Sequence, residues 1–125
     1  MTGLTYDTGA LVAAGRNERR MWALHKRTLE RGAVPTVPAP VLVEGWRGEA
    51  SMARLLQGCH VDELDEPVAR QAGLLLGSCT ISVEATDAVV VEGALRRQEP
   101  VVTGNRGHLE ALADGVHRRL GIIDT

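Results

Sequence analysis

The chain has 125 residues, of which 44% are apolar and 24% are charged, and its formal net charge is -2. This length suits one hydrophobic core, so residues 1–125 are predicted to form a single domain. The composition excludes collagen, coiled coils and disordered chains. No apolar run approaches the ~20 residues of a membrane span, and the N-terminal segment lacks the basic and apolar parts of a signal peptide. We therefore expect a cytoplasmic protein with no membrane attachment.

The composition also limits the kinds of site that the chain can build. Cys59 and Cys79 stand alone, without Cys-x-x-Cys spacing, so neither a zinc site nor a disulfide framework is predicted. Aromatic residues make up 2% of the chain, which leaves few side chains on which nucleic-acid bases could stack. The negative net charge argues against nucleic-acid binding through bulk charge, while a local basic patch stays open.

Short apolar segments alternate with helical patterns along the chain. Strands are predicted at 4–6, 33–38, 60–64, 100–103 and 120–123, and helices at 8–14, 18–31, 40–44, 49–57, 67–79, 86–97 and 106–113. Asn17 is the expected cap of the second helix, and Gly32 is its expected end. Such alternation requires a parallel sheet covered on both faces, so we expect a three-layer α/β sandwich with a short, mainly parallel sheet flanked by helices.

Polar residues follow the predicted strands at the edge where α/β sheets bind ligands. Asp7 closes the first strand, and Asn105 lies just past the strand at 100–103, with His108 three residues further on. Asp87 begins a helix whose apolar face must pack on the sheet, and Glu44 lies in an apolar helical stretch. We expect these side chains to converge.

Three carboxylates in one small pocket, those of Asp7, Glu44 and Asp87, would have a definite chemistry. Like charges a few ångströms apart require either raised pKa values or a metal ion. Oxygen ligands of this kind select Mg²⁺ or Mn²⁺. A bound divalent ion would activate water and neutralise a phosphodiester, which is nuclease chemistry.

Each of these residues also has a simpler interpretation. Asp7 and Asp87 precede helices and could be N-caps only. Glu44 could pair with Arg47 on a solvated helix face, and Asn105 could be a turn residue. Periodicity alone leaves both interpretations open.

Five short motifs, at 6–11, 37–44, 69–75, 86–91 and 101–105, resemble those of a PIN domain. This is the small α/β nuclease fold of VapC-type toxins in bacterial toxin–antitoxin pairs. The resemblance covers nearly the whole chain, and it depends on the order and spacing of motifs that are individually weak. A phosphoacceptor receiver domain fits less well, because this chain has a lone Asp7 and its single lysine, Lys26, lies far from the last strand.

The resemblance implies a Mg²⁺- or Mn²⁺-dependent endoribonuclease that is the toxin of a type II toxin–antitoxin system. Its catalytic residues would be Asp7, Glu44, Asp87 and Asn105, with the first three as metal ligands. Thr103 would orient its neighbours through its hydroxyl.

This sequence departs from the family pattern at the end of the site. Many members carry aspartate at the position of Asn105 or of His108, so one negative charge is missing here. His108 could be a proton donor or a phosphate contact, or an ordinary helix residue. The missing charge keeps open a catalytically degenerate PIN fold that acts as an RNA- or protein-binding module.

A basic stripe is predicted on the second helix. Arg20, Arg27 and Arg31 fall within about 40° of each other on an α-helix. Such a stripe would hold an RNA backbone beside the acidic pocket, with strong salt dependence. It could equally be a solvated face balanced by Glu18 and Glu30.

The same helix carries an apolar segment, Met21, Trp22 and Leu24. By resemblance, this segment would form a groove for an antitoxin peptide or a homodimer contact, although Trp22 could belong to the core. The resemblance thus implies a cognate antitoxin, an RNA substrate and a homodimer.

Overall fold

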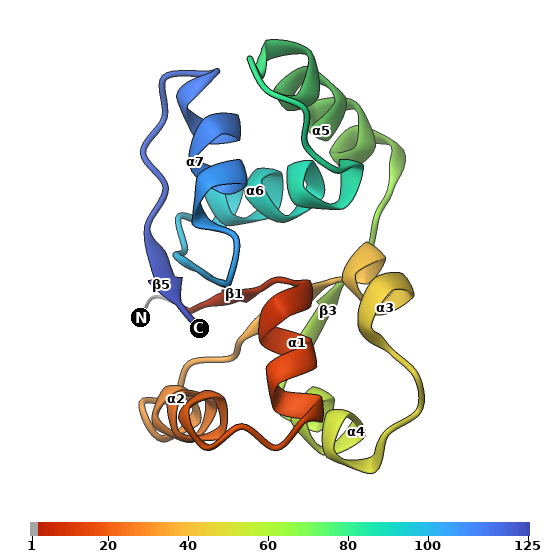
Figure 1. Cartoon of the computed structure of the whole chain (residues 1–125), viewed down its shortest axis with the longest axis vertical. Coiled ribbons are helices and arrows are strands. Elements are labelled where there is room, and N and C mark those ends of the chain that lie inside the picture. Colours follow the sequence, from red (N-terminus) through yellow and green to blue (C-terminus); the bar gives the residue numbers. More distant parts are fainter. Residues whose placement is uncertain (1–2) are drawn as a thin grey trace.

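A computed structural model describes residues 3–125 (Figure 1). Residues 1–2, part of the segment assessed above for targeting, lie outside the described residues. The strands are β1 (Thr5–Tyr6), β2 (Thr36–Pro38), β3 (His60–Asp62), β4 (Val101–Thr103) and β5 (Ile122–Asp124). The helices are α1 (Thr8–Gly15), α2 (Arg19–Glu30), α3 (Ala39–Gly45), α4 (Ala50–Gln57), α5 (Glu66–Ser78), α6 (Ala85–Arg97) and α7 (Arg106–Asp114).

The strands form one parallel sheet in the order β3-β2-β1-β4-β5. Helices α1, α2 and α4 cover one face, and α5, α6 and α7 cover the other, as Figure 1 shows. The predicted three-layer α/β sandwich is therefore confirmed. The chain moves outward from β1 through β2 to β3 and then returns to β4 on the other side of β1. The carboxyl ends of β1 and β4 thus flank the point where strand order reverses, which is where such sheets bind ligands.

Small aliphatic side chains fill the two interfaces between the sheet and the helices. Leu11, Met52 and Leu55 are buried on one side, and Val90, Val91, Leu109 and Leu112 on the other. Tyr6 is fully buried in β1, and its hydroxyl lies 2.9 Å from Nδ1 of His25. Burial raises the pKa of Tyr6, so its hydroxyl keeps its proton at neutral pH. Among the described residues, every buried side-chain nitrogen or oxygen atom has a hydrogen-bond partner.

The predicted elements all occur, but some of their boundaries differ. Helix α2 begins at Arg19 after Glu18, whereas Asn17 has a left-handed backbone (φ 57°) and is a turn residue, so its predicted role as the cap is wrong. Gly32 (φ 79°) ends this segment as predicted, because glycine adopts that conformation without steric cost. Strand β5 begins at Ile122 rather than at residue 120. Among residues 3–125, no helix is long and apolar enough to cross a membrane.

Candidate active site

A pocket of about 390 Å³ opens at the carboxyl ends of β1 and β4. It is lined by Asp7, Thr8, Gly9, Glu44, Glu84, Thr86, Asp87, Val90, Gly104, Asn105 and His108. These residues come from α1, α3, α6, α7 and the loops before them, so segments distant in sequence meet here. Five residues singled out from the sequence line this one pocket.

Asp7 is both a helix cap and a member of the pocket. Its Oδ1 accepts the backbone N–H of Ala10 at 3.0 Å, and the residue is only 6% exposed. Burial raises the pKa of the Asp7 carboxyl, and the charge of Asp87 raises it further, while a hydrogen bond from the Thr103 hydroxyl lowers it. The N-cap interpretation is therefore correct, but it does not account for a buried carboxylate beside a second one.

Asp87 lies in the first turn of α6 rather than at its start. Glu84 is the N-cap, and the Asp87 carboxylate accepts the Glu84 backbone N–H at 3.3 Å, which forms a capping box. Burial raises the pKa of Asp87, and the charge of Glu44 contributes in the same direction, while the Glu84 N–H and His108 lower it. As for Asp7, capping explains part of this geometry and the pocket explains the raised pKa.

Glu44 reaches the pocket from the last turn of α3. The Thr8 hydroxyl donates to its Oε1 at 2.6 Å, which ties α3 to the first residue of α1. Arg47 instead donates to the backbone carbonyls of Val43 and Trp46. The alternative pairing of Glu44 with Arg47 is therefore wrong.

Thr103, Asn105 and His108 form a chain of contacts after β4. The Thr103 hydroxyl accepts the Asn105 backbone N–H at 2.8 Å, and Asn105 Nδ2 lies 2.8 Å from His108 Nδ1. His108 Nδ1 is 3.6 Å from Oδ2 of Asp87. The β4 side of the pocket is thus linked to the carboxylate side through the imidazole.

The charged side chains of the pocket are predominantly acidic. Four of its residues carry carboxylates, Asp7, Glu44, Glu84 and Asp87, and none of the described lining residues is a lysine or arginine. Sequence reasoning missed Glu84 because it lies before the predicted helix; its spacing of three residues from Asp87 was the available signal. The pocket therefore has an excess of negative charge that no strong cation of the lining neutralises.

The expected close convergence of carboxylates on one point is not seen. Within residues 3–125, no three histidine, cysteine, aspartate or glutamate side chains are grouped closely enough to hold a metal ion. Asp7, Glu44 and Asp87 each accept a hydrogen bond from a protein donor of their own. The donor chemistry nevertheless fits a hard divalent cation, because the pocket offers carboxylates, an amide and few competing positive charges.

Comparison with solved structures relates this architecture to known proteins. A chain of the VapBC2 complex from Rickettsia felis, bound to promoter DNA, superposes with a TM-score of 0.73 at 14% identity, over 97% of each chain. A chain of a toxin–antitoxin complex from Klebsiella pneumoniae superposes with a TM-score of 0.67 at 16% identity, over 98% of this chain and 96% of the other. A chain of DNA-bound VapBC from Salmonella typhimurium superposes with a TM-score of 0.67 at 19% identity, over 99% of this chain and 98% of the other.

The chain has a PIN-like fold. The resemblance seen in the sequence is thus confirmed at the level of the fold. No protein-family model matches the chain, and comparison with curated proteins gives no significant match.

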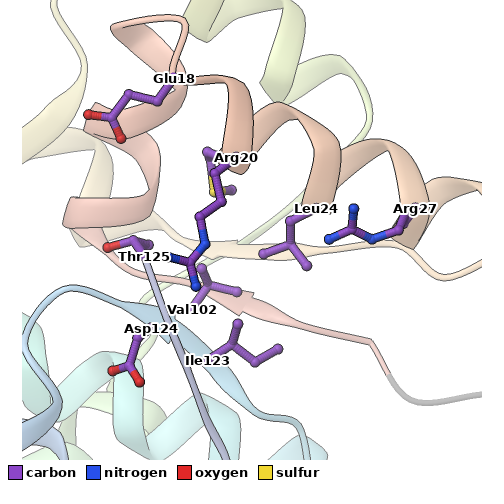
Figure 2. A pocket seen from close by; sticks show the side chains of 9 residues that line it. Glu18, Arg20, Leu24, Arg27, Val102, Ile123, Asp124 and Thr125 are labelled. Carbon is purple, nitrogen blue, oxygen red and sulfur yellow. The ribbon is translucent and has the colours of Figure 1, made fainter.

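A second pocket, of about 140 Å³, lies beside helix α2 of this PIN-like fold (Figure 2). Arg20 and Arg27 line it, and Figure 2 shows Arg20 extending toward Asp124 and Thr125. Arg31 lies with Arg27 at a neighbouring hollow of the same helix. The three arginines are exposed and follow one side of α2, so the basic stripe exists as a surface. Its role in RNA binding stays a prediction.

The apolar segment of α2 divides between core and surface. Met21 is 3% exposed and lines the floor of the second pocket, while Leu24 is half-buried beside it. Trp22 packs on the core, donates to the Ala14 carbonyl at 3.0 Å and lies under the Arg54 guanidinium. Trp22 and Leu24 are both half-buried and both pack against the core, so the interpretation of Trp22 as a core residue is partly correct.

The two cysteines are free and half-buried. Burial raises the pKa of the Cys59 thiol to about 12, so it carries no thiolate at neutral pH. Cys59 therefore has no nucleophilic character, because the thiolate is the reactive form. The acidic pocket is the better candidate for chemistry in this PIN-like fold.

Proposed function

We propose that the chain is a metal-dependent endoribonuclease that cleaves RNA phosphodiesters as the toxin of a type II toxin–antitoxin pair. The observation that carries this proposal is the pocket between β1 and β4, where four carboxylates gather without a lysine or arginine among the described lining residues. The PIN-like fold supports it, as do the toxin–antitoxin complexes in which similar chains occur.

The proposed ligands of one Mg²⁺ or Mn²⁺ ion are Asp7, Glu44 and Asp87, with Asn105 at a fourth catalytic position. The three proposed metal ligands come from three separate segments of the chain and line one pocket. Their carboxylate oxygens are hard donors. The chemistry that such an ion supplies when bound is neutralisation of phosphate charge and activation of water.

The chain's own groups keep these donors in position. The Thr103 hydroxyl accepts the Asn105 backbone N–H and donates to Asp7, so it fixes two of the four residues at once. His108 contacts the Asn105 side chain and limits its rotation. Thr8 holds Glu44 at the pocket wall through a 2.6 Å hydrogen bond. Buried or hydrogen-bonded donors of this kind reduce the entropy lost when a ligand is bound.

The proposed RNA-binding surface is the arginine stripe of α2. Arg20 and Arg27 line a pocket whose floor includes Val102 of β4, and the Gly104–Asn105 segment after the same strand borders the acidic pocket. A phosphate backbone could therefore contact the stripe while a neighbouring phosphodiester enters the acidic pocket. Binding should weaken steeply with salt, because phosphate contacts release counterions.

An antitoxin and a second copy of the chain are the proposed protein partners. The pocket beside α2 combines the apolar Leu24 and Ile123 with two arginines and with the carboxylates of Glu18 and Asp124, which suits a peptide with apolar and charged residues. On another face, Val43 is 80% exposed and Trp46 is 39% exposed, so the α3 region offers apolar surface for a homodimer contact.

The decisive test is RNA cleavage by the purified chain in Mn²⁺, Mg²⁺ or excess chelator, with sequencing of the new RNA ends. We expect cleavage that requires a divalent ion and falls at least ~100-fold in both Asp7→Asn and Asp87→Asn. The matched control is Glu63→Gln, which removes an exposed carboxylate outside the pocket and should retain activity.

A catalytically inactive RNA- or protein-binding module is the alternative function. The observation that favours it is that Asp7, Glu44 and Asp87 each keep a protein partner instead of grouping around one point. RNA that stays intact with every ion, but is retained by the wild-type chain and lost on Arg20→Gln, would establish the module and reject the nuclease.

A further inference from the structure

Helix α2 is joined to the rest of the fold by few polar contacts. The Trp22 indole N–H donates to the Ala14 carbonyl of α1 at 3.0 Å, and the Tyr6 hydroxyl of β1 lies 2.9 Å from Nδ1 of His25. Among residues 3–125, no other side-chain hydrogen bond connects α2 to another element. His25 therefore provides the one side-chain hydrogen bond between α2 and the sheet in the described part of the chain.

The imidazole of His25 is enclosed. The residue is 4% exposed, and the centroid of its ring lies 5.8 Å from that of Tyr6 and 5.7 Å from that of Trp22. On the side of Nε2, the segment after α4 packs so closely that a Cβ added at Gly58 would lie 3.2 Å from this nitrogen. The ring is thus held between α2, β1 and the end of α4.

The groups around the ring cannot neutralise an imidazolium. Tyr6 on β1 and Cys59 after α4 have raised pKa values, so both keep their protons at neutral and mildly acidic pH. Helix α4 adds the Arg54 guanidinium, which lies 5.8 Å from the centroid of the Trp22 ring and is itself positive. The charged side chains of α2 are all exposed. No carboxylate of the described residues pairs with His25, and burial lowers the pKa of its ring.

Protonation of this ring would place an unpaired charge at the interface between α2 and the sheet. The Tyr6 hydroxyl can accept a hydrogen bond from a protonated Nδ1, but a neutral hydroxyl does not balance the charge. Burying an unpaired charge is costly, and this cost disappears when α2 moves away and water reaches the ring. In that open state the ring has its ordinary pKa of about 6.5. The closed state therefore keeps its full stability above about pH 6.5 and loses stability as pH falls below this value.

We infer that His25 makes the attachment of α2 sensitive to pH: the neutral ring holds the helix on the sheet, and protonation of the ring releases it in mild acid. The consequence falls on the pocket of about 140 Å³ beside α2, since one of its walls is formed by this helix. Opening would expose Met21 and Val102, which are 3% and 0% exposed in the closed fold. The inference concerns the fold alone and goes beyond the proposed function, so it is tested without RNA, metal or partner.

The first experiment measures amide hydrogen exchange of the full chain at pH 7.5 and pH 5.5, corrected for the intrinsic exchange rates. Protection of α2 should fall several-fold at the lower pH, with about 10-fold as the limit for an opening linked to one proton. Helix α5, on the other face of the sheet, is the internal control and should keep its protection. Unchanged protection of α2, or an equal loss in α2 and α5, would overturn the inference.

The variant that tests His25 itself is His25→Gln, because glutamine is a good helix former that carries hydrogen-bonding groups and does not titrate. Protection of α2 should no longer depend on pH in this variant. The matched control is His117→Asn, at an exposed position with φ 55° that asparagine tolerates well, and it should keep the wild-type dependence. A pH dependence that persists in His25→Gln would assign the opening to another group.

The second experiment needs no variant, so it stays informative if His25→Gln does not fold. An NMR titration of the histidine rings in the wild-type chain should show His25 titrating below its ordinary value of 6.5, and the backbone signals of α2 should change with the same midpoint. A midpoint at or above 6.5, or α2 signals that do not follow the ring, would overturn the inference and leave the proposed function standing.

Discussion

The two ends of helix α6 carry carboxylate clusters of opposite electrostatic character. At the N-terminal end, Asp87 and Glu84 share the pocket with Asp7 and Glu44, and no lysine or arginine lies among the described lining residues. Burial and neighbouring carboxylates raise the pKa values of Asp7 and Asp87. The protein therefore keeps an unfavourable concentration of negative charge at this end.

At the C-terminal end, the helix supplies its own cations. Arg97 donates to Asp62 at 2.8 Å, to Glu99 at 2.6 Å and to the Thr5 hydroxyl at 3.0 Å. Arg96 also bonds Asp62 at 2.8 Å. Burial alone would raise the pKa of Asp62, but the hydrogen bonds and charges of the two arginines outweigh it and hold that pKa below its usual range.

The comparison separates carboxylates that have arginine partners from carboxylates that have none. Where carboxylates have arginine partners, their burial is compensated within the chain. Where they have none, the chain tolerates a local loss of stability, which is typical of functional sites. The acidic pocket is thus left with negative charge that no lysine or arginine of its described lining compensates.

The largest change in stability is expected from Arg97→Met, at the C-terminal end of α6, where the carboxylates have arginine partners. This change leaves Glu99, only 9% exposed, and Asp62 without one of their partners, while it keeps the aliphatic bulk of the side chain. The free energy of unfolding should fall by about 2–3 kcal/mol, as measured by urea denaturation.

The control for this variant is Arg70→Met, which removes an exposed pair with Glu66 on α5. That pair should contribute less than about 0.5 kcal/mol, because both side chains are largely solvated. Equal losses of stability in the two variants would show that the cluster at the end of α6 is no more stabilising than a surface ion pair.

At the N-terminal end of α6, where the carboxylates have no arginine partners, removing a charge should raise the stability of the fold instead of lowering it. Asp7→Asn removes one charge from the pocket and keeps an acceptor for the Ala10 N–H, since asparagine is as good an N-cap as aspartate. In metal-free buffer, the melting temperature should therefore rise by about 2–4 °C. A lower melting temperature would mean that Asp7 is needed for folding and that the pocket is not under electrostatic strain.

The pH dependence of stability should distinguish the two ends further. The folded pKa of Asp7 is raised, so its unfavourable contribution appears as pH rises above the unfolded value of about 3.9 and persists at neutral pH. The folded pKa of Asp62 is lowered, so its favourable contribution is present above about 3.9 and is lost as pH falls through the folded value.

Urea titrations between pH 3 and pH 7 would test this difference. The stability gain of Asp7→Asn over the wild type should grow with pH, and the stability loss of Asp62→Asn should shrink toward acid pH. A gain that stays constant over this range would contradict the assignment of Asp7 as a strained carboxylate.

Much of the fold follows from the alternation of short apolar segments with helical patterns in the sequence. The strand containing Val101 and Val102 was predictable, because a continuous apolar run ending in a polar turn is typical of a central parallel strand. The start of α2 was not: Asn17 suggested a cap, but it adopts the left-handed turn that asparagine also favours. A single residue preference cannot distinguish these two uses.

The site was predictable as a set of residues but not as a geometry. Asp7, Glu44, Asp87, Asn105 and His108 line one pocket, since topology brings the ends of β1 and β4 together. The individual partners could not be predicted: the Thr8 bond to Glu44 and the Glu84 capping bond depend on side-chain distances across elements.

The smallest effect on stability, and the sharpest test of the uncompensated end, is expected from Glu44→Gln. Glutamine still offers a carbonyl oxygen to the Thr8 hydroxyl, and the residue is exposed, so the free energy of unfolding should change by less than about 0.5 kcal/mol. The affinity for Mn²⁺ in a calorimetric titration should nevertheless fall at least ~10-fold, because the charge of a ligand is lost. Glu49→Gln, at an exposed cap without a side-chain hydrogen bond, is the control and should bind Mn²⁺ like the wild type. Unchanged affinity in Glu44→Gln would restrict the cation site to Asp7, Asp87 and their neighbours on β4 and α7.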